Sequence, residues 1–452
     1  MKKRLLFLML AGCLAAGSAA FAGFHNLPVY AQEKELDAQK FAETLCTGDV
    51  TELENNYTYT EELLTALEPA GGFAGLQASL KQLGALKQTG EPVVSEVSGY
   101  TSYSVPCQFE VQNVNLVINV NAKGQIAGIM TAAYAEPARS EELPEGLAEL
   151  DLGIPVEGEE GWELPGTLTL PDVQGEYPAV VLVHGSGPND RDETIGPNKV
   201  FRDLAWDLAQ QGIAVYRYDK RTYVYGQELA DDAEITLEEE TVEDAKQAVL
   251  TLKQHQNIDE EHVYVLGHSL GGEALPMIHK ALTDEGESAA GYVFLAAPAR
   301  KLPDIMREQY DFLYSLMPEL TEEQESEKDV IYEELDKLND LDSLAEDEPV
   351  LGAYKKYWEY LDQYDYVEMA GEIEESCLVL QGEEDYQVTM EDFSIWQDAY
   401  GDKSNWSFIS YPGLTHLFMP GERENGNEDY MTPQTVDPQV TADIAKFVME
   451  EK

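Results

Sequence analysis

The chain has 452 residues, more than one compact core usually holds, so two domains are expected. Its 43% apolar and 10% aromatic residues are ordinary globular values and argue against global disorder. The formal net charge of −57 argues against nucleic acid or anionic lipid as a general partner, because binding to phosphates depends on Lys and Arg.

The first 31 residues have the pattern of an export signal. Residues 1–4 are basic and residues 5–24 are apolar and small, and cleavage is expected after Ala22 or Ala31. The sequence ending at Cys13 resembles a bacterial lipoprotein box, which would leave that cysteine lipidated. Lipoprotein tethers are usually polar, whereas the residues after Cys13 stay apolar, so plain secretion is favoured. The mature chain is expected to be extracytoplasmic, with no transmembrane helix after signal removal.

Residues 32–135 are predicted to form a small α+β domain. Apolar residues at helical spacing predict three helices, over 36–45, 61–67 and 73–86. In the strand-like segment VNLVINVN four side chains share one face: Val114, Leu116, Ile118 and Val120. A turn at 121–124 then leads into a further strand.

Cysteine and histidine usage suggests neither a metal nor a disulfide framework. Outside the export signal the chain has Cys46, Cys107 and Cys377, an odd number that cannot all pair within one chain. Cys46 and Cys107 could form a bridge, and buried free thiols fit equally well. The seven histidines are too scattered for a zinc site, so no metal or cofactor is expected.

Residues 136–160 are rich in Pro, Gly and Glu and are predicted to be a linker. From 161 to 452, short apolar strands alternate with amphipathic helices, which predicts an α/β domain with a doubly wound, mostly parallel sheet. The segment 299–371 interrupts this order. It is helix-prone and acidic, with fourteen acids and two lysines over 319–348, and is expected to form an inserted helical cap.

In HVYVLGHSLGG, Ser269 stands between Gly267 and Gly271, after a buried-strand pattern and before a helical one. Glycines at these positions let the chain turn sharply and hold a serine hydroxyl exposed at a helix N-terminus, the geometry of a nucleophile elbow. The same glycines would also suit a tight turn without catalytic function. The placement between strand and helix favours Ser269 as a nucleophile.

A serine nucleophile needs a general base, and the chain order of such sites places it downstream. Only His279 and His416 follow Ser269. His279 falls inside the predicted helix after the elbow, where an exposed helical residue is the simpler interpretation. His416, in YPGLTHLF after the last predicted strand, is the expected base.

The orienting acid is expected at the end of the strand CLVLQG, in the loop GEEDYQV. Asp385 is the best candidate because a strand end followed by a short loop delivers its carboxylate beside the last-loop histidine. Glu383 and Glu384 are alternatives. Asp392, already in the next predicted helix, is less suitable.

Acyl transfer also needs donors for the developing oxyanion. The strand ending at Val183 leads into His184-Gly-Ser-Gly187, and the backbone N–H groups of Ser186 and Leu270 are the expected donors. The Ser186 hydroxyl is an alternative nucleophile that lacks the helix-start context. Neither GxGxxG nor GxxxxGK occurs there, which disfavours a phosphate loop.

Six motifs occur in order, LPGTLTLP, HGSGPNDRD, IAVYRYDKR, GHSLGG, QGEEDYQV and GLTHLF. Together they resemble the α/β-hydrolase superfamily, close to secreted bacterial carboxylesterases of the dienelactone hydrolase and serine-peptidase-like branch. The resemblance covers residues 161–452 and implies Ser269 as nucleophile, Asp385 as acid, His416 as base and a cap at 299–371. Residues 32–135 resemble a domain of unknown function that precedes extracellular hydrolases.

One departure from the superfamily concerns the loop after IAVYRYD. Many relatives have a glycine-rich segment there, whereas this chain has KRTYVYGQ, so the pocket around Lys220 and Tyr223 cannot be carried over.

The expected function is hydrolysis of small carboxylic esters through an acyl-enzyme on Ser269. A peptidase or aminopeptidase of the same fold is the alternative, and a non-catalytic binding protein is a third. Cap aromatics could line a substrate pocket, although ordinary core packing is favoured for them: Tyr354, Tyr357, Trp358 and Tyr364. The acidic cap leans towards neutral esters, and the oligomeric state stays open.

Overall fold

The computed structural model describes the chain in ten stretches: 36–68, 71–90, 92–97, 100–109, 111, 114–133, 142–159, 161–229, 232–317 and 320–450. The expected export signal and Cys13 lie outside these residues. Contacts divide the chain into a small unit, whose described residues end at 133, and a large unit, whose described residues begin at 142. No helix within the described stretches is long and apolar enough to cross a bilayer.

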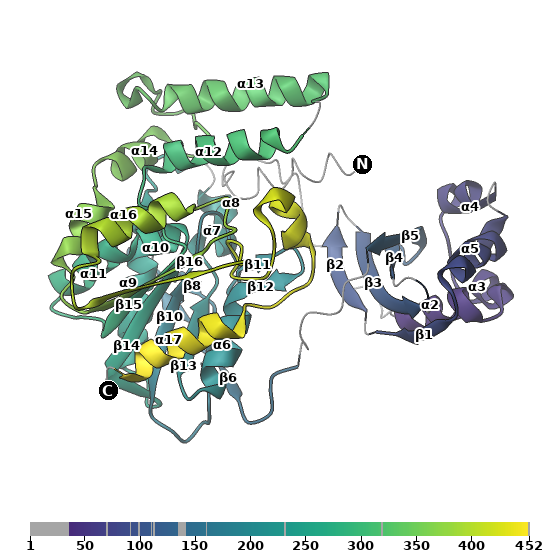
Figure 1. The fold of residues 1–452 in the computed structure, drawn as a ribbon, viewed down its shortest axis with the longest axis horizontal. Helices are drawn as coiled ribbons and strands as arrows, with labels where there is room; N and C mark the ends of the chain where they lie inside the picture. Colours follow the sequence, from purple (N-terminus) through teal and green to yellow (C-terminus); the bar gives the residue numbers. More distant parts are fainter. Residues whose placement is uncertain are drawn as a thin grey trace. The chain divides into compact units, whose positions relative to one another are not determined.

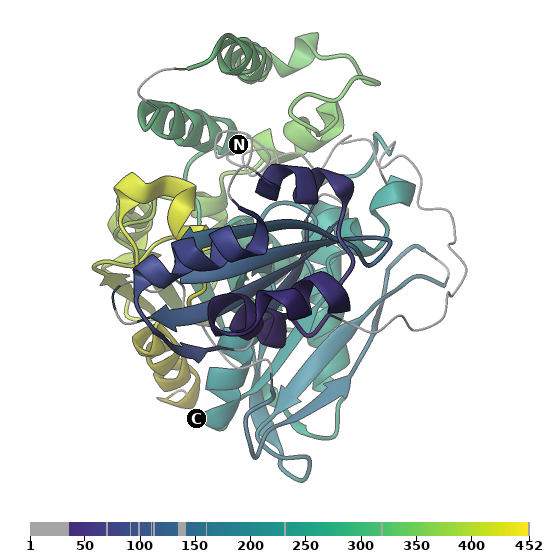
Figure 2. The same cartoon turned by 90° about the vertical axis from the view of Figure 1, so that its right-hand side faces the viewer.

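The described part of the small unit combines α-helices with an antiparallel sheet (Figures 1 and 2). Its helices are α2 (Ala38–Thr47), α3 (Val50–Asn56), α4 (Glu61–Leu67) and α5 (Gly72–Leu80). Its strands are β1 (Leu86–Thr89), β2 (Val93–Val97), β3 (Tyr100–Phe109), β4 (Val114–Asn121) and β5 (Ile126–Ala133). The path runs β1-β3-β4-β5, and β2 pairs with β3.

The core of the small unit confirms the predicted face of β4, because Val114, Leu116 and Ile118 are buried. The helix predicted over 73–86 is wrong at its C-terminal end. Helix α5 ends at Leu80, a 3₁₀ turn follows, and β1 begins at Leu86 because its backbone pairs with Phe109 of β3. Cys46 and Cys107 are both buried here and unbridged.

The large unit is built on an eight-stranded sheet in the order β17-β16-β15-β14-β10-β13-β9-β6. The strands are β6 (Ala148–Asp151), β9 (Gly166–Leu170), β10 (Tyr177–Val183), β13 (Ala214–Tyr218), β14 (Ile258–His268), β15 (Gly291–Leu295), β16 (Ser376–Gly382) and β17 (Trp406–Tyr411). The six strands from β17 to β13 are parallel, β9 runs antiparallel to β13, and β6 runs antiparallel to β9. The predicted fold class is confirmed.

The expected linker at 136–160 is partly wrong. Its residues 148–151 form β6, which pairs with β9 and is the edge strand of the sheet. Glu149 on β6 also accepts a hydrogen bond from Trp206 Nε1 at 2.8 Å and forms an ion pair with Arg217. An edge strand is held by backbone pairing on one side only, so it can be polar and resemble a linker in composition.

Helices cover both faces of the sheet, as a parallel sheet requires (Figure 1). They are α6 (Val200–Gln210), α9 (Glu243–Lys253), α10 (Leu270–Glu273), α11 (Leu275–Asp284), α16 (Met390–Tyr400) and α17 (Pro438–Glu450), with short α7 (Arg221–Val224) and α8 (Gly226–Leu229) and a π-helix at Glu238–Val242. Two small hairpins lie outside the main sheet: β7 (Ile154–Pro155) with β8 (Glu163–Leu164), and β11 (Thr194–Ile195) with β12 (Asn198–Lys199).

The cap lies between β15 and β16. Its helices are α12 (Leu302–Ser315), α13 (Glu322–Lys337), α14 (Lys355–Asp362) and α15 (Tyr366–Met369). Figure 1 shows α12 and α13 as successive layers over one end of the sheet. Tyr314 packs against Tyr332 between these two helices, with ring centroids 6.3 Å apart.

Strand order decides where a site can form. From β10 the chain goes to β13 on one side, whereas β14 lies on the other side of β10. At such a switch point the loops after the two central strands diverge and leave a crevice at their carboxyl ends. Those loops begin after Val183 and His268, and the register pairs Val183 with Gly267. The amide-bearing loop and the serine motif are therefore neighbours.

Candidate active site

Ser269 occupies a sharp turn between β14 and α10. Its φ of 54° and ψ of −123° are rare for a residue with a side chain. A Cβ at Gly267 would lie 2.1 Å from the Gly271 carbonyl oxygen, and a Cβ at Gly271 would lie 2.3 Å from the Val183 carbonyl oxygen. Both glycines are therefore required by close backbone approach. Ser269 itself is partly exposed, as an elbow presents its hydroxyl.

His416 and Asp385 form a buried pair, with His416 Nδ1 2.7 Å from Asp385 Oδ2. The other oxygen of Asp385 accepts the backbone N–H groups of Gln387 at 2.7 Å and Val388 at 3.0 Å. Gln381 Nε2 donates to Oδ2 at 3.0 Å. These donors fix the carboxylate, so it can hold the histidine ring in one orientation.

The alternative acids and the alternative base are engaged elsewhere. Glu383 accepts a hydrogen bond from Ser410, and Glu384 accepts the Arg423 N–H. Asp392 is fully buried and binds the Arg300 guanidinium at 2.7 Å. His279 lies on α11 with its Nδ1 3.2 Å from the Tyr292 hydroxyl. Of the acids considered, Asp385 is the one that contacts His416.

The loop His184–Gly187 is held by side chains that bind its backbone groups. Lys220 Nζ donates to the Gly185 carbonyl at 2.9 Å. Asn189 Nδ2 contacts the carbonyls of Gly185, Ser186 and Gly187 at 3.2, 3.1 and 3.3 Å. With the loop carbonyls bound in this way, the Ser186 N–H is available as a hydrogen-bond donor. Among the described residues, the N–H groups of Ser186 and Leu270 have no acceptor.

This loop also lies against the elbow, since a Cβ at Gly185 would come 3.1 Å from Ser269 Cβ. His416 is brought to the same place by His268, the residue before the serine. The two imidazole rings have centroids 4.7 Å apart. The structure thus brings together the predicted residues at one end of the sheet.

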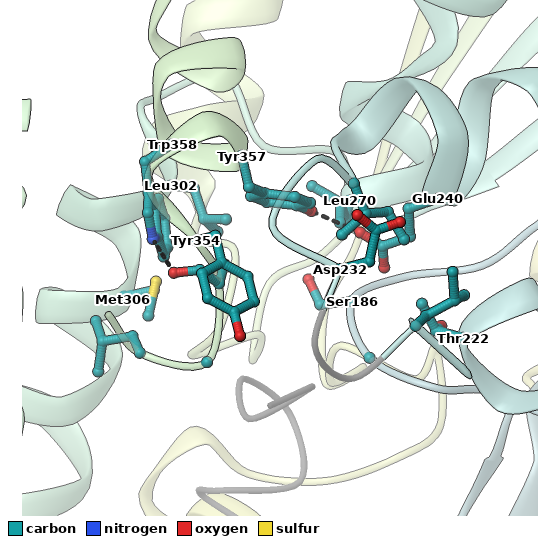
Figure 3. A pocket seen from close by; sticks show the side chains of 16 residues that line it. Ser186, Thr222, Asp232, Glu240, Leu270, Leu302, Met306, Tyr354, Tyr357 and Trp358 are labelled. Atoms are coloured by element: carbon teal, nitrogen blue, oxygen red, sulfur yellow. Dashed lines mark hydrogen bonds between the residues drawn. The ribbon is translucent and has the colours of Figure 1, made fainter. Parts of the chain in front are cut away.

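A cavity opens beside the two amides (Figure 3). Ser186 and Leu270 line it together with Leu302 and Met306 of α12 and residues of the cap before and within α14. Three of the four predicted cap aromatics, Tyr354, Tyr357 and Trp358, are among the lining residues, although Tyr357 and Trp358 are also core-buried. The fourth, Tyr364, packs on Tyr360 instead, with centroids 5.2 Å apart.

A buried polar chain forms one wall of the cavity. The Tyr357 hydroxyl donates to Glu240 Oε2 at 2.7 Å (Figure 3). Glu240 Oε1 forms an ion pair with Lys220 Nζ at 2.6 Å. Burial, with Glu240 as a second cause, raises the pKa of Tyr357 well above its usual range, so its hydroxyl stays protonated. Lys220 is buried, whereas Tyr223 is 54% exposed. The loop KRTYVYGQ, which differs from the superfamily pattern, thus contributes Lys220 to the site and leaves Tyr223 exposed to solvent.

Sequence reasoning missed Glu193 and Glu240 as parts of this region, left the contribution of Lys220 to the pocket open, and gave His268 no function. The available signal was that Glu193 directly follows the HGSGPNDRD motif and His268 lies within GHSLGG. Their pairing partners are distant in sequence, so the motifs alone did not disclose the contacts.

Comparison with known proteins shows the family of this chain. A family model described as serine aminopeptidase S33 matches residues 178–424. Esterase EstD of Thermotoga maritima is 37% identical over 357 residues, covering 78% of this chain and 80% of that protein. The chain belongs to the α/β-hydrolase superfamily. The resemblance and the hydrolase class inferred from the motifs are confirmed.

The solved structures to which the chain is similar are more distant in sequence. An esterase of Pyrococcus furiosus is 15% identical, with 70% of this chain and 97% of that one covered and a TM-score of 0.42. Est1E from Butyrivibrio proteoclasticus is 16% identical, with 67% and 98% covered and a TM-score of 0.42.

Proposed function

We propose that this α/β-hydrolase cleaves small carboxylic esters through an acyl-enzyme on Ser269. The observation that carries the proposal is the elbow at Ser269, on which the amide-bearing loop and the His416–Asp385 pair converge. The similarity to Esterase EstD supports an ester rather than another acyl substrate.

In the proposed first step, Ser269 Oγ attacks the ester carbonyl and His416 Nε2 accepts its proton. Asp385, bound at Nδ1, keeps the proton of the neutral ring on that nitrogen and stabilises the imidazolium that forms. The N–H groups of Ser186 and Leu270 donate to the oxyanion. His416 then protonates the leaving alcohol, and water activated by the same histidine releases the acid.

The cavity supports neutral substrates. Its charged lining residues are Asp232 and Glu240, and Glu240 is already paired with Lys220. An anionic acyl group would therefore meet the negative charge of Asp232, which forms no ion pair with the described residues. We expect higher kcat/KM for p-nitrophenyl esters of neutral acids than for a dicarboxylic half-ester of equal length. Faster turnover of the half-ester would contradict this preference.

Aminopeptidase activity is the second candidate. It is favoured by the family description and by Asp232, a carboxylate in the cavity that could receive a substrate ammonium. Comparing p-nitrophenyl esters with aminoacyl p-nitroanilides separates the two activities. Higher kcat/KM on the anilides would make the peptidase the principal function.

Ser269→Ala tests the nucleophile, and Ser186→Ala is its matched control. Ser186→Ala removes the rival hydroxyl and keeps the backbone N–H. We expect Ser269→Ala to lose roughly 10⁴-fold or more in kcat and all labelling by a fluorophosphonate. Ser186→Ala should keep labelling and most activity. A folded, fully active Ser269→Ala protein would refute the mechanism.

We also propose that the mature chain is exported. The basic start and apolar stretch of residues 1–31 support cleavage by a signal peptidase. The N-terminal sequence and mass of protein recovered outside the cytoplasm test this. A lipid-modified N-terminus at Cys13 would show an anchored protein instead.

A further inference from the structure

Beneath the elbow lies a buried pair of side chains that the proposed reaction does not use. Glu193 Oε2 is 2.9 Å from His268 Nδ1, and both side chains are 2% exposed. Glu193 has a φ of 48°, a conformation that a residue with a side chain adopts only when its surroundings impose it. Such strain is common at functional sites.

The pair contacts the two halves of the site. Glu193 Oε1 accepts the Gly185 N–H at 2.8 Å, next to the Ser186 amide. His268 Nε2 lies 3.0 Å from the backbone carbonyl oxygen of His416. A carbonyl can only accept a hydrogen bond, so Nε2 carries a proton.

The charges of Glu193 and His268 agree with these hydrogen bonds. Burial works against the charged form of each partner, but the opposite charge and the hydrogen bond outweigh it. The pKa of Glu193 is lowered and that of His268 is raised. With a carboxylate at Nδ1 and a carbonyl at Nε2, the His268 ring donates at both nitrogens.

We propose that Glu193 and His268 are positioning residues that hold the oxyanion loop and the backbone of the base in register with the elbow. This rests on the proposed function and deepens it. Glu193 fixes Gly185, and with it the direction of the Ser186 N–H, while His268 fixes the His416 backbone from the position before Ser269. A donor displaced by a fraction of an ångström from the developing oxyanion loses much of its effect, so the pair acts on kcat more than on KM.

Glu193→Gln is the direct test, because glutamine keeps the size and one acceptor oxygen but removes the charge. We expect kcat to fall about 10- to 100-fold with KM changed less than about twofold. A trifluoromethyl ketone, which places an oxyanion in the hole, should bind more weakly by the factor lost in kcat/KM. Rates are expressed per site titrated with fluorophosphonate, which removes the effect of misfolded protein.

Two further variants sharpen this test. His268→Gln should show a similar loss, and the double variant should be little worse than either single one, since the residues act as a unit. The control is Asp203→Asn, which disturbs another buried carboxylate, 3.3 Å from Arg202 on helix α6. It should lower stability and leave kcat per titrated site unchanged.

An unchanged kcat per titrated site in Glu193→Gln, or fully additive losses in the double variant, would overturn the proposal. If Ser269→Ala kept full activity although the fluorophosphonate no longer labelled it, the proposed function itself would fail, which is a separate result. Should neither single variant yield titratable enzyme, ¹⁵N-histidine spectra of the wild type decide. His268 must show protons on both ring nitrogens at neutral pH and must shift when the ketone binds; absence of either refutes the inference.

Discussion

Glu273, the last residue of the elbow helix α10, is buried without a compensating charge. Its side chain is 2% exposed, and its Oε2 has no hydrogen-bond partner among the described residues. Burial, and secondarily the negative charge of Asp392, raises its pKa from 4.5 to about 8. At pH 7 the folded protein therefore holds a neutral carboxylic acid where the unfolded chain holds a carboxylate.

The sign of the effect follows from linkage. A group whose pKa is raised by folding stabilises most below its unfolded pKa, and this stabilisation is lost as the pH rises from 4.5 to about 8. Each pH unit in this interval costs about 1.4 kcal/mol, so the loss at pH 7 is about 3 kcal/mol. Glu273→Gln has no proton to lose. We expect it to be more stable than the wild type by about 3 kcal/mol at pH 7 and nearly equal to it near pH 4.5.

Urea unfolding followed by tryptophan fluorescence measures this difference. All five tryptophans lie in the large unit, so the signal reports on the unit that contains Glu273: Trp162, Trp206, Trp358, Trp396 and Trp406. Glu260→Gln, at an exposed position on β14, is the matched control and should follow the wild type at every pH. If Glu273→Gln and the wild type lose stability in parallel between pH 5 and 8, the reasoning about Glu273 is wrong.

Two further predictions concern the site. Asp385→Asn should fold with the hydrogen bonds of its loop largely retained and lose roughly 10³- to 10⁴-fold in kcat, because an amide cannot hold the His416 tautomer. Steady-state kinetics on a p-nitrophenyl ester measures this loss. A loss under tenfold would argue against a catalytic role of the Asp385–His416 pair. Tyr357→Phe removes the hydroxyl that donates to buried Glu240 and keeps the aromatic ring in the wall of the cavity. It should lower the free energy of unfolding by about 1–2 kcal/mol. Equal urea midpoints for the variant and the wild type would show that this hydrogen bond does not contribute to stability.

The triad candidates were predictable because each depends on a local pattern. Ser269, Asp385 and His416 each follow a strand whose apolar run is visible in the sequence, and parallel strands deliver the residues that follow them to one edge of the sheet. The order of the motifs then limits which histidine and which acid can meet. Their spacing along the chain did not have to be known.

The contacts around the triad candidates depend on pairings between distant segments. Glu193 and His268 are 75 positions apart, and no periodicity relates a loop glutamate to the residue before an elbow serine. Strand β6 was missed for a similar reason: its four residues, two of them acidic, are too few to form a strand pattern of their own, and pairing with β9 makes them a strand. Local patterns identify residues that act, whereas the residues that hold them in place emerge only from the assembled fold.

The positions inside Gly-His-Ser-Leu-Gly therefore differ in the reason why each requires its residue type. Gly267 and Gly271 are required by backbone atoms closer than any Cβ allows, and Leu270 supplies an N–H that its side chain does not affect. Besides the proposed nucleophile Ser269, His268 is the position that needs a particular side chain, because its two nitrogens link Glu193 to the loop of His416. A buried charge pair is costly unless both partners stay in place, so retaining one directly beneath the elbow is better explained by the geometry it enforces than by stability.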